Sequence, residues 1–433
     1  MWIQRFSRAI KLTVCAFCLI SLVFGLNIQP TYAQDTQPCP GFTAEDQSDI
    51  YHEIDFGESL RFHLCWHNMP EVESASILIE IETFSTPFDG TAPAPTDADT
   101  GDLINLNHEL NLAQTLIPPF SEVSYEWTIN YQSGDSEVFP QKTFVYSDNR
   151  VKWQEIGEEN LRVHSTAEHE PIAKIALGVI ERTLPKIEAV IPLANDAVEQ
   201  NTPIDVYLYP DSQTFQSALR LTGLDWVAGK ASPEIGVIMI PITSGSDEAA
   251  AQADLEQRLP HELSHMLVYR ATGDGYRNLP SWFDEGVATS FETVPNPNYA
   301  FSIANVTDST QLIPFSELCV NLPIQPPEMA LRGYAQSHAL IGYIKAKYGS
   351  EAIQETIKAA AAGAHCDEAI VQGVGKSTDE LAQEWLNGRQ PDPLEPGSPL
   401  RVGLFLFLGL FVLIAVILWT RTYGTRTISE FNG

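Results

Sequence analysis

The sequence has few basic residues for its length. Among 433 residues there are 25 Lys and Arg against 56 Asp and Glu, which gives a formal net charge of −31 at pH 7. A surface of this sign repels phosphate backbones and anionic lipid headgroups, and it favours solubility. The composition therefore argues against nucleic acid as a partner and is compatible with basic substrates.

Long apolar runs are absent except near the two ends of the chain. Three basic residues precede an apolar run over 12–26, and Thr31-Tyr32-Ala33 supplies the small residues that a signal peptidase recognises. This pattern predicts a signal peptide over 1–33, cleaved after Ala33. If it were not cleaved, the same segment would serve as an N-terminal anchor.

The second apolar run, 402–420, is uncharged and long enough to cross a bilayer as a helix. Arg421 and Arg426 follow it, which favours a cytoplasmic tail over 421–433. We therefore expect a single transmembrane helix over 401–420 in the cell membrane, with the large domains extracytoplasmic. A Pro-rich linker over 391–400 would join the helix to them.

Cysteine is scarce as well. Apart from Cys15 and Cys18 in the predicted signal, the chain has four: Cys39, Cys65, Cys319 and Cys366. These four contain no Cys-x-x-Cys spacing, which argues against a metal site built from cysteines. In an exported chain they indicate two disulfides, with three possible connectivities. We expect Cys39–Cys65 and Cys319–Cys366, because each bridge then stays within one predicted domain.

The rest of the chain is too long for one hydrophobic core, and its pattern changes once. Residues 34–165 are rich in β-branched segments such as Ser76-Ile77-Leu78-Ile79-Glu80-Ile81, separated by turn clusters. This predicts an all-β, Ig-like sandwich over 34–165. From about Ala167 apolar residues recur at three- and four-residue spacing, which predicts an α+β domain over 166–390. There is no internal repeat.

The strongest chemical signal is His261-Glu262-Leu263-Ser264-His265. Residues at i and i+4 share one face of a helix, so both imidazoles can reach one metal ion. Glu262 lies off that line and can act as a general base toward a metal-activated water. The pattern predicts a zinc site with its own base.

A second predicted helix follows a Gly-rich turn. It reads Leu279-Pro280-Ser281-Trp282-Phe283-Asp284-Glu285-Gly286-Val287-Ala288 and places Glu285 twenty positions after His265. The HELSH segment followed by W-x-x-E-G-x-A resembles the gluzincin metallopeptidases, in particular the peptidase MA-like group. That group also has a later Y-A-Q-S helix ending in Y-G, which here corresponds to Tyr334-Ala335-Gln336-Ser337 and Tyr348-Gly349.

The resemblance implies a thermolysin-like zincin domain that binds Zn²⁺ through His261, His265 and Glu285. It makes Glu262 the general base. Asp284 is a rival for the third ligand, because aminopeptidase-like gluzincins have the glutamate one position closer to the second histidine. We favour Glu285, since the following Gly-x-Ala aligns with it.

Three further side chains are candidates around the metal. By its position in the Y-A-Q-S helix, Tyr334 would stabilise the oxyanion, and His338, one turn further on, is its rival. Glu292 lies seven residues beyond Glu285, so it could orient a ligand histidine. Each of the three could equally be an ordinary packing or surface residue.

The segment over 235–242 reads as a strand before the HELSH helix, and Pro241 suits a sheet edge. In gluzincins an edge strand holds the extended substrate, so we expect this strand to do so or simply to support the helix.

The function that these features predict is a membrane-anchored zinc metallopeptidase acting on peptides or proteins, with a weak preference for endopeptidase action. The alternative is a surface binding or adhesion protein that keeps the zincin fold without turnover. Zinc-dependent hydrolysis of a substrate other than a peptide is a third, narrower possibility.

Overall fold

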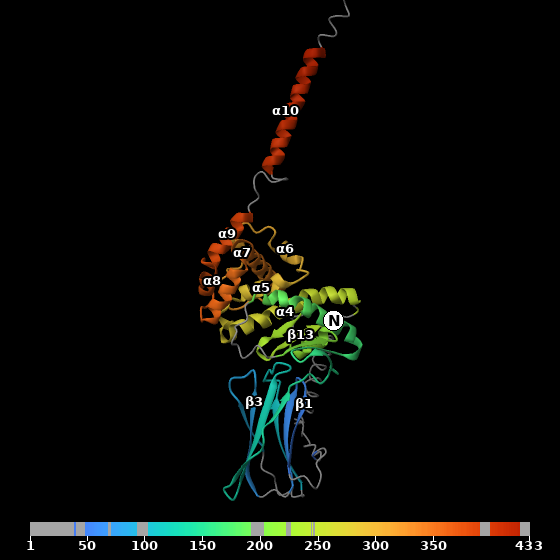
Figure 1. The fold of residues 1–433 in the computed structure, drawn as a ribbon, viewed down its shortest axis with the longest axis vertical. Coiled ribbons are helices and arrows are strands. Elements are labelled where there is room, and N and C mark those ends of the chain that lie inside the picture. The colour runs from blue at the N-terminus through green and yellow to red at the C-terminus, as the bar shows by residue number, and fades with distance from the viewer. Residues whose placement is uncertain are drawn as a thin grey trace, which may run out of the picture.

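A computed structural model describes residues 39, 48–67, 71–92, 103–191, 203–221, 227–243, 245, 247–389 and 399–424. Figure 1 shows a β-rich unit at one end of the molecule, and next to it a second sheet covered by helices. The predicted signal peptide (1–33), residues 391–398 of the predicted linker and 425–433 of the predicted tail lie outside the described residues.

The β-rich unit consists of two antiparallel sheets. One has the order β1-β2-β5 and the other β4-β3-β6-β7, with β8 also paired to β6. The strands are β1 (Ser48–Asp55), β2 (Ser59–His67), β3 (Val72–Ile81), β4 (Phe88–Ala92), β5 (Leu103–Asn111), β6 (Glu122–Tyr131), β7 (Ser136–Val138) and β8 (Lys142–Val145). In β6 every second side chain is buried, as expected for a strand with one face on a core.

The sandwich core is aromatic and includes the fully buried Trp127, Tyr125 and Phe62. The disulfide Cys39–Cys65 joins the start of the described chain to β2. This pairing agrees with the prediction.

The second sheet has the order β12-β13-β11-β10-β9. Its strands are β9 (Gln154–Glu158), β10 (Leu161–Ser165), β11 (Ile204–Tyr209), β12 (Lys230–Ser232) and β13 (Val237–Pro241). β11 runs parallel to β10 and β13, whereas β9 and β12 are antiparallel to their neighbours. The sheet therefore includes β9 and β10, which precede residue 166, where the second domain was expected to begin.

The expected edge strand over 235–242 is in fact internal. β13 lies between β11 and β12, and β12 forms the edge. Pro241 is the last residue of β13, and the next ladder hydrogen bond, from Ile242 N–H to the Tyr209 carbonyl at 2.8 Å, comes after it. A proline at a strand end removes no donor that the sheet needs, so it did not mark the edge.

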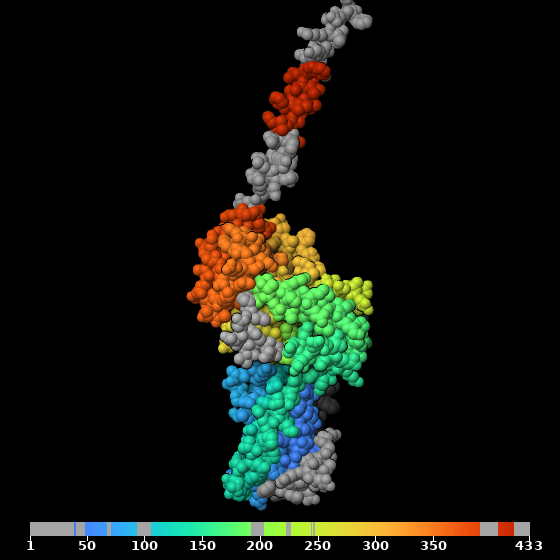
Figure 2. Space-filling view, in the orientation of Figure 1, coloured from blue at the N-terminus to red at the C-terminus, as the bar shows by residue number. Residues whose placement is uncertain are grey.

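This second sheet is a layer shared by two hydrophobic cores. Because side chains alternate along a strand, Val206 and Leu208 of β11 join the helical core, while Tyr209 joins the sandwich core. Met239 of β13 and Phe215 of the following helix α3 also pack into the sandwich core. The β-sandwich therefore lies on one face of the sheet together with α3, whereas α2 (Glu170–Glu188) and α4 (Glu248–Thr272) lie on the other. Figure 2 shows the sandwich at the end of the molecule opposite the C-terminal helix.

The helices are α2 (Glu170–Glu188), α3 (Ser212–Ala218), α4 (Glu248–Thr272), α5 (Ser281–Phe291), α6 (Asn298–Ile303), α7 (Pro327–Ala361), α8 (Asp367–Val374), α9 (Thr378–Arg389) and α10 (Pro399–Gly424). Short 3₁₀ helices include η4 (Pro233–Ile235) and η5 (Gly273–Asn278). α4 packs against α2 and α5, and α7 packs against α5 and α8. The predicted disulfide Cys319–Cys366 is present and ties the loop before α7 to the start of α8.

The predicted transmembrane helix over 401–420 is wrong. Among the described residues, no helix is both long and apolar enough to span a bilayer. The structure therefore does not support the predicted single-pass anchor in the cell membrane.

Candidate metal centre

The two histidines of the HELSH segment lie on α4. This helix begins after Asp247, whose carboxylate accepts a hydrogen bond from the Ala250 N–H at 2.9 Å. His261 and His265 are one turn apart, and their ring centroids are separated by 5.1 Å. The helix therefore presents both rings on the same side.

A proline next to the first histidine connects α4 to α5. Pro260 has no N–H, so the carbonyl of Glu256, four residues earlier, loses its helical donor. The N–H of Thr293, just beyond the end of α5, donates to that carbonyl at 3.0 Å. The carbonyl that lacks a donor within α4 thus accepts a hydrogen bond that holds the end of α5 against α4.

α5 carries Glu285 and is held close to α7. A Cβ added to Gly286 would lie 2.5 Å from Ile341 Cγ1 and 2.7 Å from the Ser337 carbonyl oxygen, both on α7. Only glycine allows the two helices this approach. Glu285, the residue before it, is therefore positioned by backbone packing on α7 as well as by the tie to α4.

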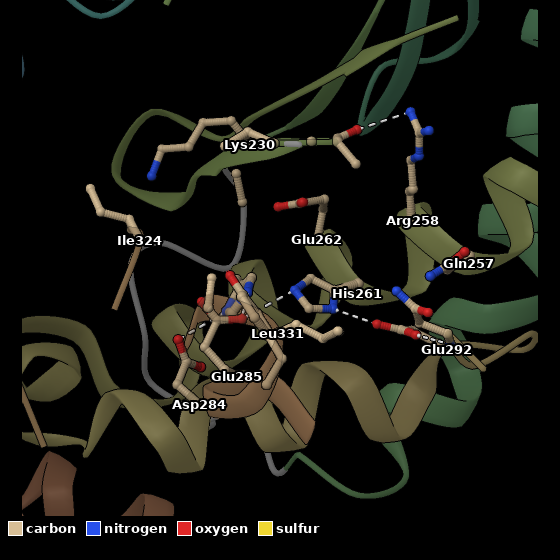
Figure 3. Close-up of a pocket in the computed structure, with 18 of the residues that line it drawn as sticks. Lys230, Gln257, Arg258, His261, Glu262, Asp284, Glu285, Glu292, Ile324 and Leu331 are labelled. Carbon is tan, nitrogen blue, oxygen red and sulfur yellow. Dashed lines mark hydrogen bonds and ion pairs between the residues drawn. The ribbon is translucent and has the colours of Figure 1, made fainter. Parts of the chain in front are cut away.

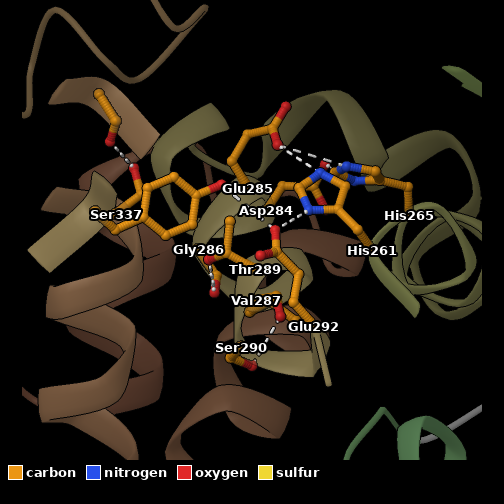
Figure 4. A network of polar contacts seen from close by, with 12 residues as sticks. His261, His265, Asp284, Glu285, Gly286, Val287, Thr289, Ser290, Glu292 and Ser337 are labelled. Atoms are coloured by element: carbon orange, nitrogen blue, oxygen red, sulfur yellow. Dashed lines mark hydrogen bonds and ion pairs between the residues drawn. The ribbon is translucent and has the colours of Figure 1, made fainter. Parts of the chain in front are cut away.

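The three predicted ligands converge. Glu285 Oε2 lies 3.2 Å from His261 Nε2 and 3.6 Å from His265 Nε2. One donor atom from each side chain falls within 4.8 Å of the other two, and Figure 4 shows the carboxylate directed at both imidazoles. Two nitrogens and one oxygen are the donor set of a three-ligand catalytic zinc site.

Two more carboxylates contact the outer nitrogens of the histidines. Glu292 Oε1 lies 3.0 Å from His261 Nδ1, and Asp284 Oδ2 lies 2.9 Å from His265 Nδ1. An ionised carboxylate can only accept, so each Nδ1 carries the donated proton and Nε2 is the ring nitrogen directed at Glu285. The structure thus places Asp284 behind His265, not with the converging donors, and Glu292 behind His261.

The protonation of this group supports a cation site. Burial lowers the pKa of His261, but hydrogen bonds to Glu285 and Glu292 outweigh it and raise that pKa to about 9. Burial raises the pKa of Glu285, but His265 and His261 hold it well below its usual range. Glu285 Oε2 is buried and makes no well-aligned hydrogen bond. The residues therefore fit a metal ion, whose positive charge would replace the shared proton.

The donors open into a cleft of about 570 Å³. Its walls come from the edge strand β12 and the segment before it, from α4 and α5, and from the start of α7. In Figure 3, Glu262 lies between the edge strand and His261. The cleft thus places a free carboxylate beside the converging donors.

Glu262 is enclosed by the segment leading into β12. A Cβ on Gly229 would lie 2.6 Å from Glu262 Oε1. Arg258, one turn before Glu262 on α4, donates to the carbonyls of Ala228 and Pro241, each at 3.1 Å. The guanidinium therefore ties the strand segment to the helix at the place where glycine leaves room for the carboxylate.

Comparison with protein families gives one finding. Residues 186–388 match the family model described as the Peptidase MA superfamily. The match supports a peptidase MA-like domain over this segment. His261, Glu262, His265 and Glu285 all lie inside it, and a domain of this type supports peptidase activity.

The other comparisons add little to this assignment. No curated protein matches the chain. Among solved structures, a polysaccharide deacetylase from Bacillus cereus matches with 8% sequence identity and a TM-score of 0.19. The match covers 41% of this chain and 56% of that protein, so the chain spans just over half the length of that protein. A TM-score this low supports no shared fold.

The two oxyanion candidates of the peptidase MA-like domain differ in position. Tyr334 lines the cleft, with its ring centroid 6.3 Å from that of His261, and burial together with Glu285 and Glu262 raises the pKa of its phenol well above the usual value. His338 is not on the lining of this cleft and packs against Tyr299 at 5.6 Å between ring centroids. Only Tyr334 can therefore face a substrate there.

Three residues that hydrogen-bond the outer carboxylates were not predicted from the sequence. Tyr276 of η5 donates to Asp284 Oδ2 at 2.7 Å, and Tyr299 of α6 donates to Glu292 Oε1 at 3.4 Å. The backbone N–H of Asn296 donates to the other oxygen of Glu292 at 3.3 Å. These groups support the carboxylates from separate segments, and no local sequence pattern connects either tyrosine with the carboxylate that it contacts.

Proposed function

We propose that this chain is a zinc-dependent metallopeptidase that cleaves peptide bonds in the cleft between β12 and α4. The observation that carries the proposal is the convergence of His261, His265 and Glu285 with both outer imidazole nitrogens already hydrogen-bonded to carboxylates. Nothing but a metal ion or a proton can balance that donor set. The peptidase MA-like match supports the same activity.

His261, His265 and Glu285 would hold the zinc ion. Bound there, zinc would lower the pKa of water and polarise the substrate carbonyl. Asp284 and Glu292 would keep the two Nε2 lone pairs directed at the ion.

Glu262 would act as the general base and then as the general acid. Its carboxylate would take a proton from the attacking water and pass that proton to the leaving amine. Tyr334 would donate a hydrogen bond to the oxygen that gains negative charge. The edge strand β12 has main-chain groups free to pair with an extended peptide along the cleft.

The test is Glu262→Gln in the full chain. We expect the wild-type protein to bind about one zinc ion per chain and to cleave peptides blocked at both ends, and the variant to keep zinc while kcat falls about 10²- to 10⁴-fold. Metal content is measured by mass spectrometry and cleavage by fluorogenic peptides with and without chelator. The matched control, Glu248→Gln, changes an exposed glutamate in the first turn of the same helix and should leave kcat unchanged.

Two results would contradict the proposal. Full activity of the Glu262→Gln variant would remove the general base from the mechanism. A wild-type chain that holds zinc but cleaves no peptide would favour a binding protein with a zincin fold.

A further inference from the structure

Apart from the proposed base Glu262, the charged groups on the floor of the cleft are paired with one another. Arg258 forms an ion pair with Asp254 at 2.7 Å, in addition to its two backbone contacts. Asp284, Glu285 and Glu292 each contact a histidine. None of these groups is left over to bind a charged part of a substrate.

Lys230 differs from them. It lies on the edge strand β12, lines the cleft and is exposed. Over the described part of the chain its ammonium group has no hydrogen-bond or ion-pair partner, although its backbone pairs with Met239 in the sheet. In Figure 3 its side chain extends from the strand along the cleft, toward the side on which Ile324 lies. Its ammonium group is therefore available to a ligand in the cleft.

The other exposed charge of the lining does not neutralise Lys230. Glu234 follows β12 in η4, and no ion pair within 4.0 Å joins it to Lys230 among the described residues. Glu234 also lies near Glu82 of the sandwich, whose carboxyl pKa is raised mainly by burial and in small part by Glu234.

An apolar surface stands beside Lys230. Ile324 is 55% exposed and lines the cleft, together with Pro327, Ala330 and Leu331 at the start of α7. A ligand held between this surface and the lysine would be partly shielded from water. Such shielding strengthens an ion pair relative to one that is fully solvated.

We propose that Lys230 binds a carboxylate of the substrate, so that the cleft prefers peptides with an acidic group near the scissile bond. The source is an Asp or Glu side chain or the C-terminal carboxylate of the peptide. This inference rests on the proposed peptidase function. The net charge of −31 would repel an acidic peptide. At physiological salt, however, charges more than about 8 Å away are largely screened, so the nearby ammonium group of Lys230 determines which substrate charge the cleft favours.

The test compares pairs of blocked peptides that differ only by Glu or Gln at each position on either side of the cleaved bond. For wild type we expect kcat/KM to be about three- to fivefold higher with Glu at one position. The preference should disappear in Lys230→Met. In Lys230→Glu, a third peptide with Lys at that position should become the preferred substrate. A peptide with a free C-terminus, compared with its amide, distinguishes the terminal carboxylate from a side chain.

The control is Lys142→Glu, which makes the same change in net charge on β8 of the sandwich and should leave the Glu-to-Gln ratio as in wild type. A ratio of one in wild type for every pair, or a ratio that survives in Lys230→Met or shifts equally in Lys142→Glu, would overturn the proposal.

A binding measurement separates this proposal from the peptidase function. The affinities of the same peptide pairs are measured on chelator-treated Glu262→Gln protein, which does not turn over. Tighter binding of the acidic peptide that depends on Lys230 supports the subsite even if no peptide is cleaved. Equal binding of both peptides, with and without Lys230, rejects it.

Discussion

At the scale of single residues, the site depends on which nitrogen of each imidazole faces the cleft. Glu292 and Asp284 accept from the Nδ1 atoms of His261 and His265, which leaves the Nε2 atoms directed at Glu285. Each carboxylate thus selects a tautomer and a ring orientation before any metal arrives. The orientation of the two candidate ligand histidines is therefore set by carboxylates that do not converge on the site themselves.

This arrangement predicts the effect of replacing either carboxylate, that of Asp284 or that of Glu292, by an amide. We expect Asp284→Asn and Glu292→Gln each to weaken zinc affinity about 10- to 100-fold, because the amide no longer enforces a protonated Nδ1. Competition with a chromogenic chelator measures the affinity. Glu328→Gln, an exposed change in the first turn of α7, should leave it unaltered. Unchanged affinity in both site variants would show that the carboxylates do not orient the histidines.

At the scale of secondary-structure elements, α4 is joined to its neighbours by three hydrogen bonds to backbone carbonyls. The Glu256 carbonyl, released by Pro260, accepts from Thr293 at the end of α5. On the other side, Arg258 binds the carbonyls of Ala228 and Pro241 and so links α4 to the strands β12 and β13. The helix with the histidines, the helix with Glu285 and the edge of the sheet therefore form one rigid frame.

We expect Arg258→Met to destabilise the fold by about 2 kcal/mol, because it leaves Asp254 without its cation and two strand-end carbonyls without a donor. Both partners are mostly buried, with side-chain exposures of 18% and 24%. Urea-induced unfolding measures the loss. Arg182→Met removes an exposed arginine that contacts Glu256 of the same helix and should cost less than about 0.5 kcal/mol. Equal losses of unfolding free energy in the two variants would show that the contacts of Arg258 do not stabilise the fold.

At the scale of the whole molecule, the five-stranded sheet serves two cores. Leu208 and Ile240 face the helices, whereas Tyr209 and Met239 face the sandwich. Arg220, in the loop after α3, adds a polar contact by donating to the carbonyls of Leu112 and Gly57 in the sandwich. The β-sandwich therefore helps to support the five-stranded sheet that lines the candidate site.

The shared sheet predicts that the two units unfold together. Phe215 of α3 is fully buried in the sandwich core, so we expect Phe215→Ala to cost about 3 to 5 kcal/mol. Scanning calorimetry should show one transition that shifts as a whole. Phe301→Ala, at a phenylalanine that is 79% exposed, should shift it little. A separate sandwich transition that stays in place in Phe215→Ala would show that the two units are independent.

Part of this architecture could be predicted from the sequence because the signals are local. His261 and His265 are one helical turn apart, and the residues around Glu285 form a recognisable segment. The four cysteines outside the predicted signal allowed only three pairings, and the observed one keeps each bridge within one unit. The helical periodicity that begins near Ala167 likewise located α2.

Other expectations failed because local patterns do not say what an element packs against. Pro241 suggested a sheet edge, but β12, only three residues long, pairs outside β13. The apolar run at 402–420 suggested a transmembrane helix, and no described helix meets the length and apolarity that a bilayer requires.

The sequence by itself determined the donor chemistry of the candidate site, since the spacing of His261, Glu262 and His265 follows from helix geometry alone. Only the tertiary structure decided that Asp284 lies behind His265, that Tyr276 and Tyr299 support the carboxylates, and that Gly229 makes room for Glu262. The physical reason is the range of the contacts. A helix turn relates neighbours in sequence, whereas these contacts join separate segments that are brought together only by burying a common core.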